Sequence, residues 1–409
     1  MNDKRSIPSK RDLEELRRIA KENFHNLKLL EEEITICQER LEAIEKMGGG
    51  KTFSVLEAWV PASDLKKFRE TVSEVTKLHY IEVKEKKDAP SLLQNPRFAK
   101  PFELLLELYS PPKYGRLDPT PVVAVTFSLF FGLMLTDAVY GVVLALLAFG
   151  IYQGIGRYNP GIRRFSAFLA IGGISTAVLG ALLGSYFGNL PQQLGIQVPM
   201  LLDPMTDIMS LVGITVGIGI LHLTIGLILG VVDRVKNKEY LNAVSSQGVW
   251  LVFVAGLVLA LVASLLDLNV LLLPGVALII LSVLLRMVFV FREAGVVSSL
   301  LSVFNFSGFV GDIFSYTRLM ALCVGTAGIA LAINFMAALV NDMIPIVGVV
   351  IAIVVLLVGH LFNMGMNGLG AFVHGIRLHF LEFFTKFYEG GGTLYKPFYA
   401  TRKITEVRK

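Results

Sequence analysis

The sequence is poor in charged residues, and this restricts the class of protein. Of its 409 residues only 17% are charged while 54% are hydrophobic, and the mean hydropathy is +0.62. A water-soluble domain carries about 25% charged residues, so the composition indicates an integral membrane protein. The net charge of +5 does not indicate nucleic acid as a partner, because the basic residues gather in the N-terminal region and in short loops between apolar runs.

Cysteine is scarce as well. Only Cys37 and Cys323 occur, one in a predicted soluble helix and the other inside a predicted membrane span. A disulfide needs two Cα atoms within about 7 Å, so we expect no bridged, secreted scaffold. The polar N-terminus shows no cleavable signal peptide.

The sequence divides near Pro119, and its first part begins with a heptad-like pattern. Apolar residues recur mostly at steps of three and four, with Glu, Lys and Arg between them: Leu13, Leu16, Ala20, Leu27, Leu30, Ile34, Cys37, Leu41 and Ile44. This spacing is typical of one strand of a coiled coil, which we place at residues 1–47. Its partner strand would come from another chain or another copy. The alternative is an amphipathic helix that packs on the domain that follows.

Residues 48–118 predict a small α/β module and a linker. Thr52 to Val60 and His79 to Val83 have strand composition, and Pro61 to Lys77 has helical periodicity. Proline then recurs at positions 90, 96, 101, 111, 112 and 119, which is typical of an ordered linker that leads to the bilayer.

Residues 119–392 predict the membrane domain. Apolar runs suitable for spanning lie at about 121–152, 164–187, 208–232, 248–265, 269–291, 305–340 and 345–380. Basic residues occupy every second loop, which should be cytoplasmic together with the tail at 393–409. If the N-terminal part is also cytoplasmic, the first run must cross twice and turn near Thr136-Asp137. This gives about eight spans, the first two of them short.

The last two spans are unusually long. A helix of about 36 residues is about 54 Å long, well beyond a hydrocarbon thickness of about 30 Å, so we expect both helices to be steeply tilted. The sequence therefore predicts a mainly α protein, in which a polytopic membrane helical domain is preceded by a coiled-coil helix and a small α/β cytoplasmic module.

Arg318 lies in the middle of the apolar segment from Phe306 to Val340. A buried arginine is among the costliest residues in a membrane helix, and its guanidinium stays protonated, so it offers a fixed positive charge to an anionic partner. Small residues share its side of the helix by the helical period: Gly311, Ala321, Gly325, Gly328 and Ala332. They serve either close packing within this chain or a smooth face along which a moving partner slides.

A polar stripe follows one side of the final span at steps of three or four residues. Its members are His360, Asn363, Asn367, Gly370, His374 and Arg377. Such a stripe in hydrocarbon faces water or protein. The alternatives are a hydrogen-bonded seam between helices that buries His374, and for Arg377 a side chain that extends to the membrane interface.

Several sequence blocks resemble one known family. These are Ser315-Tyr316-Thr317-Arg318-Leu319, the segment from His374 to Phe383, and Lys386-Phe387-Tyr388-Glu389-Gly390. They resemble the last two membrane helices of the stator subunit of V/A-type rotary ATPases, called subunit a or subunit I. Further similarity at Asn95-Pro96-Arg97-Phe98, at 114–121 and at 131–141 extends the resemblance over most of the chain from about Ala58 to Pro397.

The resemblance implies two ion half-channels that face a rotor ring of small subunits, each with one membrane carboxylate. Arg318, aided by Arg377, would lower the pKa of each passing carboxylate and separate the two water-accessible paths. For the cytoplasmic path we expect Asp137, Tyr140 and Glu382, and for the outer path His360, Asn363 and Asn367. Further half-channel candidates are Asp312, Ser315 and His374. We expect no catalytic site, cofactor or metal in this chain, since ATP hydrolysis would belong to other subunits.

Two features depart from the family pattern. Full-length relatives carry a long N-terminal domain with both coiled-coil strands, so we expect a truncated or split form whose missing half comes from a separate chain. Relatives often place a carboxylate near the outer channel where this chain offers the amides Asn305 and Asn367. The expected partners are the rotor ring, the peripheral-stalk and central-stalk subunits and the lipid bilayer, in a prokaryotic cell membrane with both termini cytoplasmic.

The competing class is a secondary transporter that binds an anionic substrate at Arg318. Such transporters have internal repeats and broken helices near the middle of the membrane. The sequence shows no convincing repeat, and the apolar pattern around Arg318 is unbroken. The sequence does not decide between H⁺ and Na⁺, or between ATP synthesis and hydrolysis.

Overall fold

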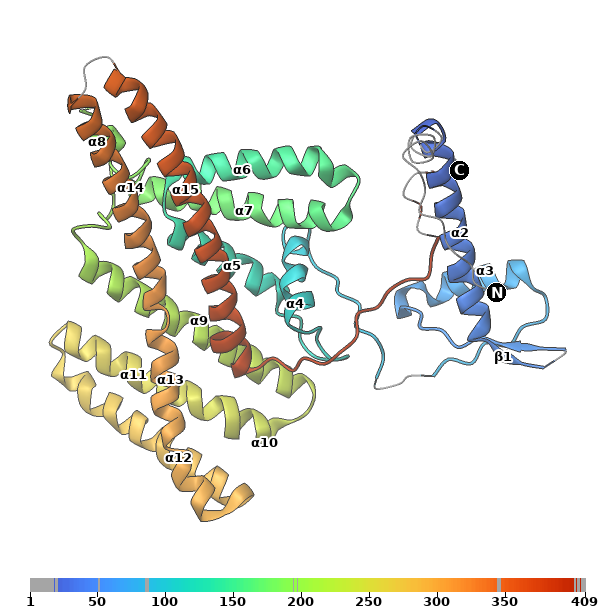
Figure 1. Cartoon of the computed structure of the whole chain (residues 1–409). Helices are drawn as coiled ribbons and strands as arrows, with labels where there is room; N and C mark the ends of the chain where they lie inside the picture. The colour runs from blue at the N-terminus through green and yellow to red at the C-terminus, as the bar shows by residue number, and fades with distance from the viewer. Residues whose placement is uncertain are drawn as a thin grey trace, which may run out of the picture. The chain divides into compact units, whose positions relative to one another are not determined.

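The structure is a computed structural model of the chain. It describes residues 18, 21–50, 52–84, 88–193, 195–196, 198–343, 347–400, 402 and 405. The chain divides into two compact units, one formed by Leu93–Thr393 and the other by Met1–Leu92 with Leu394–Lys409. The cartoon in Figure 1 labels the elements of both units.

Within its described residues, the small unit contains one long helix and little sheet. Its elements are α2 (Phe24–Glu45), β1 (Gly48–Gly49), β2 (Ser54–Val55), a 3₁₀ turn (Ala62–Asp64) and α3 (Leu65–Val75). The two strands pair antiparallel as a two-residue hairpin. The strands predicted at 52–60 and 79–83 are wrong in extent, since only Ser54–Val55 pairs in the first and none of the second does. An isolated two-stranded hairpin buries little apolar surface and is only marginally stable, so longer strands are not favoured here.

Helix α2 exposes the predicted heptad positions that lie within the described residues, whereas Ile36 on the same helix is buried. The exposed positions are Leu27, Leu30, Ile34, Cys37, Leu41 and Ile44. The predicted positions Leu13, Leu16 and Ala20, like Lys403, Arg408 and Lys409 of the tail, lie outside the described residues. An exposed apolar row is what a coiled-coil strand presents without its partner, and the coiled coil stays a prediction.

The larger unit is built from helices, most of them apolar. Among the described residues, six helical segments are long and apolar enough to cross a membrane: Pro160–Leu182, Ile208–Lys236, Tyr240–Leu265, Asn269–Leu301, Phe304–Met343 and Val347–Lys386. Two shorter apolar helices precede them, α5 (Thr120–Leu135) and α6 (Ala138–Gln153). The mainly α, polytopic architecture predicted from the sequence is confirmed, while the number of spans stays a prediction.

Several of these long segments contain more than one element. The elements are α7 (Pro160–Leu182), α9 (Ile208–Lys236), α10 (Tyr240–Asn242), a π turn (Ala243–Gly248), α11 (Val249–Leu265), α12 (Asn269–Leu301), α13 (Phe304–Phe314), α14 (Thr317–Met343), α15 (Val347–Arg377), a second π turn (Leu378–Phe383) and a 3₁₀ turn (Phe384–Lys386). The shorter elements are 3₁₀ turns at Lys100–Phe102 and Ile155–Arg157, with α4 (Glu103–Tyr109) and α8 (Leu190–Gln193).

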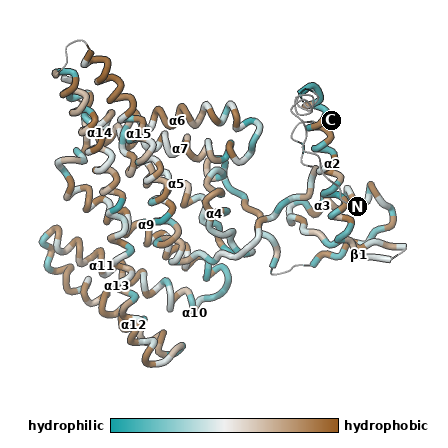
Figure 2. The backbone as a smooth tube through the Cα atoms, viewed as in Figure 1, coloured by the Kyte–Doolittle hydropathy of each residue, from teal (hydrophilic) through white to brown (hydrophobic). Residues whose placement is uncertain are grey.

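The outer surfaces of these helices are strongly apolar. Hydrophobic positions run along nearly their whole length in Figure 2. On α12, Val270 and Leu273 are 85% and 78% exposed, and on α15 Leu357 and Phe362 are more than half exposed. Exposing such surfaces to water is unfavourable, whereas lipid chains in a bilayer cover them. The helices also satisfy their own backbone hydrogen-bonding groups, as the hydrocarbon core of a bilayer requires.

The break between α5 and α6 falls at Thr136-Asp137, where the sequence predicts a turn. Asp137 caps α6, since its Oδ1 accepts hydrogen bonds from the backbone N–H groups of Val139 and Tyr140 at 3.0 Å each. The two helices have 16 residues each, and at about 1.5 Å per residue each is about 24 Å long, shorter than the hydrocarbon core.

Neighbouring helices pack in pairs, α6 with α7, α11 with α12 and α14 with α15 (Figure 1). Glycine permits the closest of these approaches. A Cβ at Gly141 on α6 would lie 2.2 Å from the backbone nitrogen of Ala177 on α7. A larger residue at this position would force the two helices apart.

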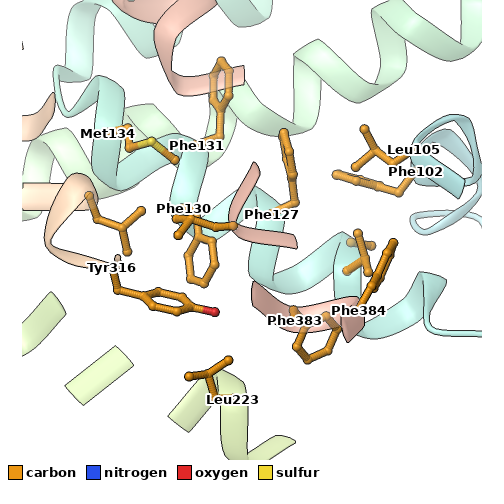
Figure 3. Close-up of a cluster of buried hydrophobic side chains, with 14 of the residues drawn as sticks. Phe102, Leu105, Phe127, Phe130, Phe131, Met134, Leu223, Tyr316, Phe383 and Phe384 are labelled. Carbon is orange, nitrogen blue, oxygen red and sulfur yellow. The ribbon is translucent and has the colours of Figure 1, made fainter. Parts of the chain in front are cut away.

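The core of the unit is aromatic and surrounds α5. Phe127, Phe130 and Phe131 of α5 meet Tyr316 and Phe383, which come from the last two spans (Figure 3). These five side chains are all nearly fully buried. The core therefore fixes the short helix α5 against the segments that carry the predicted site.

The expectation of an unbroken helix through Arg318 is wrong. Helix α13 ends at Phe314 and α14 begins at Thr317, and the junction tightens to three-residue hydrogen bonds such as Leu319 N–H to Tyr316 O at 2.9 Å. The final span changes geometry directly after Arg377, where α15 gives way to a π turn. Both arginines thus lie at helix irregularities, which the apolar pattern does not reveal.

Candidate functional site

Arg318 is the second residue of α14, and its side chain is 22% exposed. Its Nη1 lies 3.8 Å from Glu382 Oε1, which is an ion-pair contact beyond hydrogen-bond distance. The same Nη1 atom is buried and has no hydrogen-bond partner. Glu382 thus partly balances the charge of the guanidinium without occupying its donors.

Glu382 is the centre of a cluster of polar side chains. Its side chain is 5% exposed, and its Oε2 atom also has no hydrogen-bond partner. Ser315 lies within hydrogen-bond reach of this carboxylate, and Asp312 acts on it electrostatically. Asp312 forms an ion pair with Lys386. The structure therefore brings together the predicted residues Arg318, Glu382, Asp312 and Ser315.

His374 and Arg377 complete this cluster from the end of α15. His374 lies near both Arg318 and Arg377, whose positive charges act on its imidazole. Its Nδ1 atom is buried without a hydrogen-bond partner, so His374 is not the satisfied core histidine of the alternative interpretation. Arg377 is exposed at the last turn of α15, where the helix dipole favours a positive charge. We call these residues, with Arg318, Glu382, Asp312 and Ser315, the arginine cluster.

The described part of this chain leaves the small residues beside Arg318 open. A Cβ added at Gly311, Gly325 or Gly328 would meet no atom within 4 Å. Ala321 and Ala332 on the same side are exposed. Packing within the described part of this chain does not explain these residues, so this face of α13 and α14 is free for another molecule.

A second polar group is fully buried and hydrogen-bonded. The hydroxyl of Tyr140 lies 2.6 Å from His360 Nδ1, and His360 Nε2 lies 2.9 Å from Asn334 Oδ1. Asn334 Nδ2 donates to the backbone oxygen of Phe187 at 2.8 Å and to Asn189 Oδ1 at 3.2 Å. Because an amide oxygen only accepts, His360 Nε2 must donate and Nδ1 of a neutral ring accepts from Tyr140.

Asn363 and Asn367 extend this group along α15. Asn363 Nδ2 donates to the Tyr140 hydroxyl at 3.0 Å and to the backbone oxygen of Thr326 at 3.1 Å, and Asn367 donates to Asn363 Oδ1. We call Tyr140, His360, Asn334, Asn363 and Asn367 the amide network. Three residues expected on the outer path thus lie together, and Tyr140, expected on the cytoplasmic path, joins them.

Asp137 also belongs to the neighbourhood of the amide network. Its Oδ1 caps α6, and its Oδ2 accepts from Ser185 Oγ at 3.2 Å and from the backbone N–H of Gly188 at 2.9 Å. Its side chain is buried and fully hydrogen-bonded. The structure does not bring Asp137 or Tyr140 to Glu382, so the three residues expected on one path divide between two places.

Sequence reasoning missed Asn334 of the amide network and Lys386, which pairs with Asp312 of the arginine cluster. Asn334 is a lone amide in the apolar run from Phe306 to Val340, and its polarity was a signal that something hydrogen-bonds it there. Lys386 lies nine residues after Arg377. The π turn at Leu378–Phe383 separates the two residues, and Lys386 forms an ion pair with Asp312 that the sequence does not reveal. Within the described residues, no three His, Cys, Asp or Glu side chains gather to hold a metal ion.

Together these features define a class: a polytopic helical membrane protein with a permanent cation beside an open helix face and two separate polar groups. The sequence profile of the V-type ATPase 116kDa subunit family matches residues 8–154 and 304–400, more than half of the chain. The matched segments contain all members of the arginine cluster and the amide network. The chain belongs to this family, and the resemblance noted in the sequence is confirmed.

Archaeal relatives agree with this assignment. A-type ATP synthase subunit I of Methanocaldococcus jannaschii is 34% identical over 98% of this chain and 63% of the relative. The protein of the same name from Pyrococcus horikoshii is 39% identical over 87% of this chain and 55% of the relative. That from Methanothermobacter thermautotrophicus is 35% identical over 98% of this chain. The chain spans about three fifths of the length of the first of these relatives.

Proposed function

We propose that this chain acts as the membrane stator subunit of a rotary V/A-type ATPase or ATP synthase. It has no catalytic site of its own in this proposal, and it couples movement of H⁺ or Na⁺ to rotation of a ring of carboxylate-bearing membrane subunits. The observation that carries the proposal is that Arg318 stands, with an unmet hydrogen-bond donor, beside a glycine face that nothing in the described chain covers.

The open face fits a partner that moves. Gly325 and Gly328 lie about two and three turns beyond Arg318 on α14. Because glycine has no side chain, nothing protrudes from the helix at these positions to interlock with a passing helix. A ring helix can therefore approach closely and still slide. A carboxylate on that helix would meet the guanidinium, and the opposite charge would lower the pKa of the carboxylate and release its ion.

The arginine cluster supports one half-channel. Glu382 and Asp312 supply carboxylates, and His374 supplies an imidazole, beside the guanidinium of Arg318. These are groups that pass protons or hold small cations. We assign this cluster to the cytoplasmic path because Lys386 and the basic tail follow it directly in the sequence.

The amide network supports the other half-channel. Tyr140, His360 and Asn363 form a continuous chain of hydrogen bonds that ends at Asn334 and the backbone of Phe187. We assign this network to the outer path, and we assign Tyr140 to it in place of the cytoplasmic path because its hydroxyl contacts His360. Asp137 is proposed as the residue that holds the end of α6 in place beside the network.

In this proposal the guanidinium of Arg318 separates the two half-channels and so gives the coupling. A permanent positive charge between two water-filled half-channels prevents ions from crossing except on the ring carboxylate. Each elementary charge that crosses 100 mV contributes about 2.3 kcal/mol, so several ions must pass for each ATP.

The proposal implies partners and an orientation. The partners are the rotor ring, the central-stalk and peripheral-stalk subunits, and a separate chain that supplies a second coiled-coil strand to α2. The exposed apolar row of α2 supports the last of these. We place the protein in a prokaryotic cell membrane with both termini in the cytoplasm.

A secondary transporter is not favoured. The helix break at Ser315-Tyr316 is a feature that some transporters share. However, the face beside Arg318 opens to the outside of the chain, whereas a transporter would enclose its substrate site between repeats. The break therefore does not outweigh the family assignment.

Reconstitution with the ring and the catalytic subunits tests the proposal. We expect Arg318→Ala to abolish ion pumping coupled to ATP, because the charge that separates the two paths is lost, while ATP hydrolysis by the catalytic subunits continues. Arg292→Ala is the matched control, since Arg292 is exposed on α12 and belongs to neither polar group. Full coupled pumping by Arg318→Ala would refute the proposal.

A further inference from the structure

A cavity of about 300 Å³ lies beside the last turn of α9. It is lined by α9, by the π turn before α11, by α12 and by the segment that follows α15. One part of its wall is apolar and includes Trp250, Leu227 and Phe387. Another part carries three basic side chains, Arg234, Arg286 and Lys386. The cavity is thus amphipathic, and of its three cations Lys386 pairs with a member of the arginine cluster, Asp312.

Two of the three cations that line this cavity have no carboxylate partner among the described residues. Its acidic wall residue, Glu389, pairs with Arg116 at 3.1 Å, and Lys386 pairs with Asp312. Among the described residues no carboxylate pairs with Arg234 or Arg286. These two arginines donate only to backbone oxygens, Arg234 to Asn242 at 3.0 Å and Arg286 to Ser245 at 2.9 Å. Asp233, Glu239 and Glu389 share Arg116 instead, so the guanidinium groups of Arg234 and Arg286 keep N–H donors for an anion.

Arg286 also has an unmet hydrogen-bond donor. Its Nε atom is buried and has no hydrogen-bond partner, while its Nη1 atom is fixed to the π turn at Ser245. A guanidinium held in this way presents its remaining N–H groups at a fixed angle, which suits the oxygens of a phosphate. A buried donor without a partner is unfavourable, so a ligand that accepts a hydrogen bond from it is favoured.

The position in the unit indicates the source of the phosphate. Arg234 lies in the last turn of α9, Trp250 in the first turn of α11, and Lys386 at the end of the final span. Three apolar segments thus reach their polar ends at this cavity. Headgroups lie at this level of a bilayer, and basic pockets between membrane helices bind anionic headgroups there.

We propose that this cavity binds the phosphate of an anionic phospholipid, with Arg286 and Arg234 as its ligands and Trp250 against the glycerol or the start of the acyl chains. A soluble phosphate ester shares the anionic chemistry but would leave the apolar wall uncovered. The inference does not depend on the proposed ion path. Both arginines lie in the segment 155–303, which the family profile does not match.

Native mass spectrometry of the purified full chain in detergent tests this inference. The chain is titrated with phosphatidylglycerol, with phosphatidylcholine and, as the soluble arm, with glycerol phosphate. We expect one copy of phosphatidylglycerol to be retained in preference to phosphatidylcholine. Since each cation near a headgroup contributes about 1 kcal/mol, Arg286→Gln should weaken retention about fivefold and the double variant with Arg234→Gln about twentyfold or more.

Arg292→Gln on the same helix α12 is the control, because it removes the same charge from an exposed position outside the cavity. Arg286→Lys keeps the charge and should retain part of the preference even if Arg286→Gln fails to fold. The inference is overturned if the chain does not distinguish the two lipids, or if Arg292→Gln loses as much retention as Arg286→Gln. Displacement of the lipid by millimolar glycerol phosphate would overturn the assignment to a lipid.

Discussion

Two polar regions of the membrane unit differ in how completely their hydrogen bonds are satisfied. In the amide network Tyr140, His360 and Asn334 each meet defined partners, and Asn334 is 1% exposed. In the arginine cluster, buried atoms of Arg318, Glu382 and His374 have no partner. Buried polar atoms without a hydrogen-bond partner in their own chain indicate a partner outside it, such as water, an ion or another subunit.

This contrast separates two roles. A satisfied network of buried polar groups stabilises the contact between helices, here α6, α14 and α15. An unsatisfied cation beside an open face contributes little to the stability of the isolated chain and is available to a partner. Substitutions in the amide network should therefore lower stability first, whereas substitutions in the arginine cluster should lower function first.

The largest expected effect on stability is at Asn334. Asn334→Leu removes three hydrogen bonds and leaves His360 and the Phe187 backbone oxygen without their partner. Hydrogen bonds between membrane helices contribute about 0.6 kcal/mol on average and up to about 1.7, so we expect a loss of about 2–4 kcal/mol. Thermal unfolding of the purified chain in detergent measures it.

Asn341→Leu is the control for that measurement, because Asn341 is an exposed asparagine on the same helix α14. Its unfolding midpoint should stay within experimental error of the original chain. Equal midpoints for Asn334→Leu and Asn341→Leu would show that the amide network does not support the fold.

Glu382→Gln should show the opposite balance. The Glu382 carboxylate is buried and its Oε2 has no hydrogen-bond partner, so the amide removes a desolvation cost that offsets the lost attraction to Arg318 at 3.8 Å. The free energy of unfolding should therefore change by less than about 1 kcal/mol. Coupled ion transport should fall at least about tenfold, because an amide neither takes up nor releases protons. Transport is measured in vesicles that contain the assembled complex, with Glu293→Gln on α12 as the control. Normal transport by Glu382→Gln would remove Glu382 from the path.

The smallest expected effect on the isolated chain is at Gly328. Because a Cβ there meets no atom within 4 Å, Gly328→Ala should leave the fold intact and gain about 0.5–1 kcal/mol from helix propensity. By contrast, Gly219→Ala places a Cβ 2.8 Å from the Tyr316 ring and should destabilise the chain. The two unfolding midpoints compare an open face with a packed one, and a shift in the same direction for both would contradict the difference.

Much of this architecture follows from the sequence. Hydrophobic length alone locates the long helices, and Asp137 in an apolar run marks the turn between α5 and α6 because a carboxylate is a good helix cap. Arg318 is a conspicuous candidate because its charge is so costly in hydrocarbon.

Other features could not be read from the sequence. Helical periodicity shows which residues share one helix face, but it does not show which helix faces which. For this reason the sequence predicts Tyr140 on the same path as Glu382, although the Tyr140 hydroxyl contacts His360. The sequence does not reveal the break before Arg318, because a tightened turn of three-residue hydrogen bonds leaves the apolar pattern unchanged.

A network that joins α2 to the tail shows the same limitation in the small unit. Arg402 pairs with Glu33 at 2.8 Å, although 369 positions separate them in the chain. A link of this kind has no local signature, since both residues are ordinary surface charges in their own segments. Only the folded chain reveals it.

The central claim is that the face of Arg318 meets a moving carboxylate-bearing helix, and cysteine crosslinking tests it most directly. In a background without Cys37 and Cys323, Ala321→Cys on the open face is combined with a cysteine next to the ring carboxylate, and Val270→Cys, 85% exposed on α12, is the control. We predict a disulfide from position 321 that stops ATP-driven rotation and is reversed by reductant, with none from position 270. Crosslinking from position 270 in place of position 321 would contradict the account.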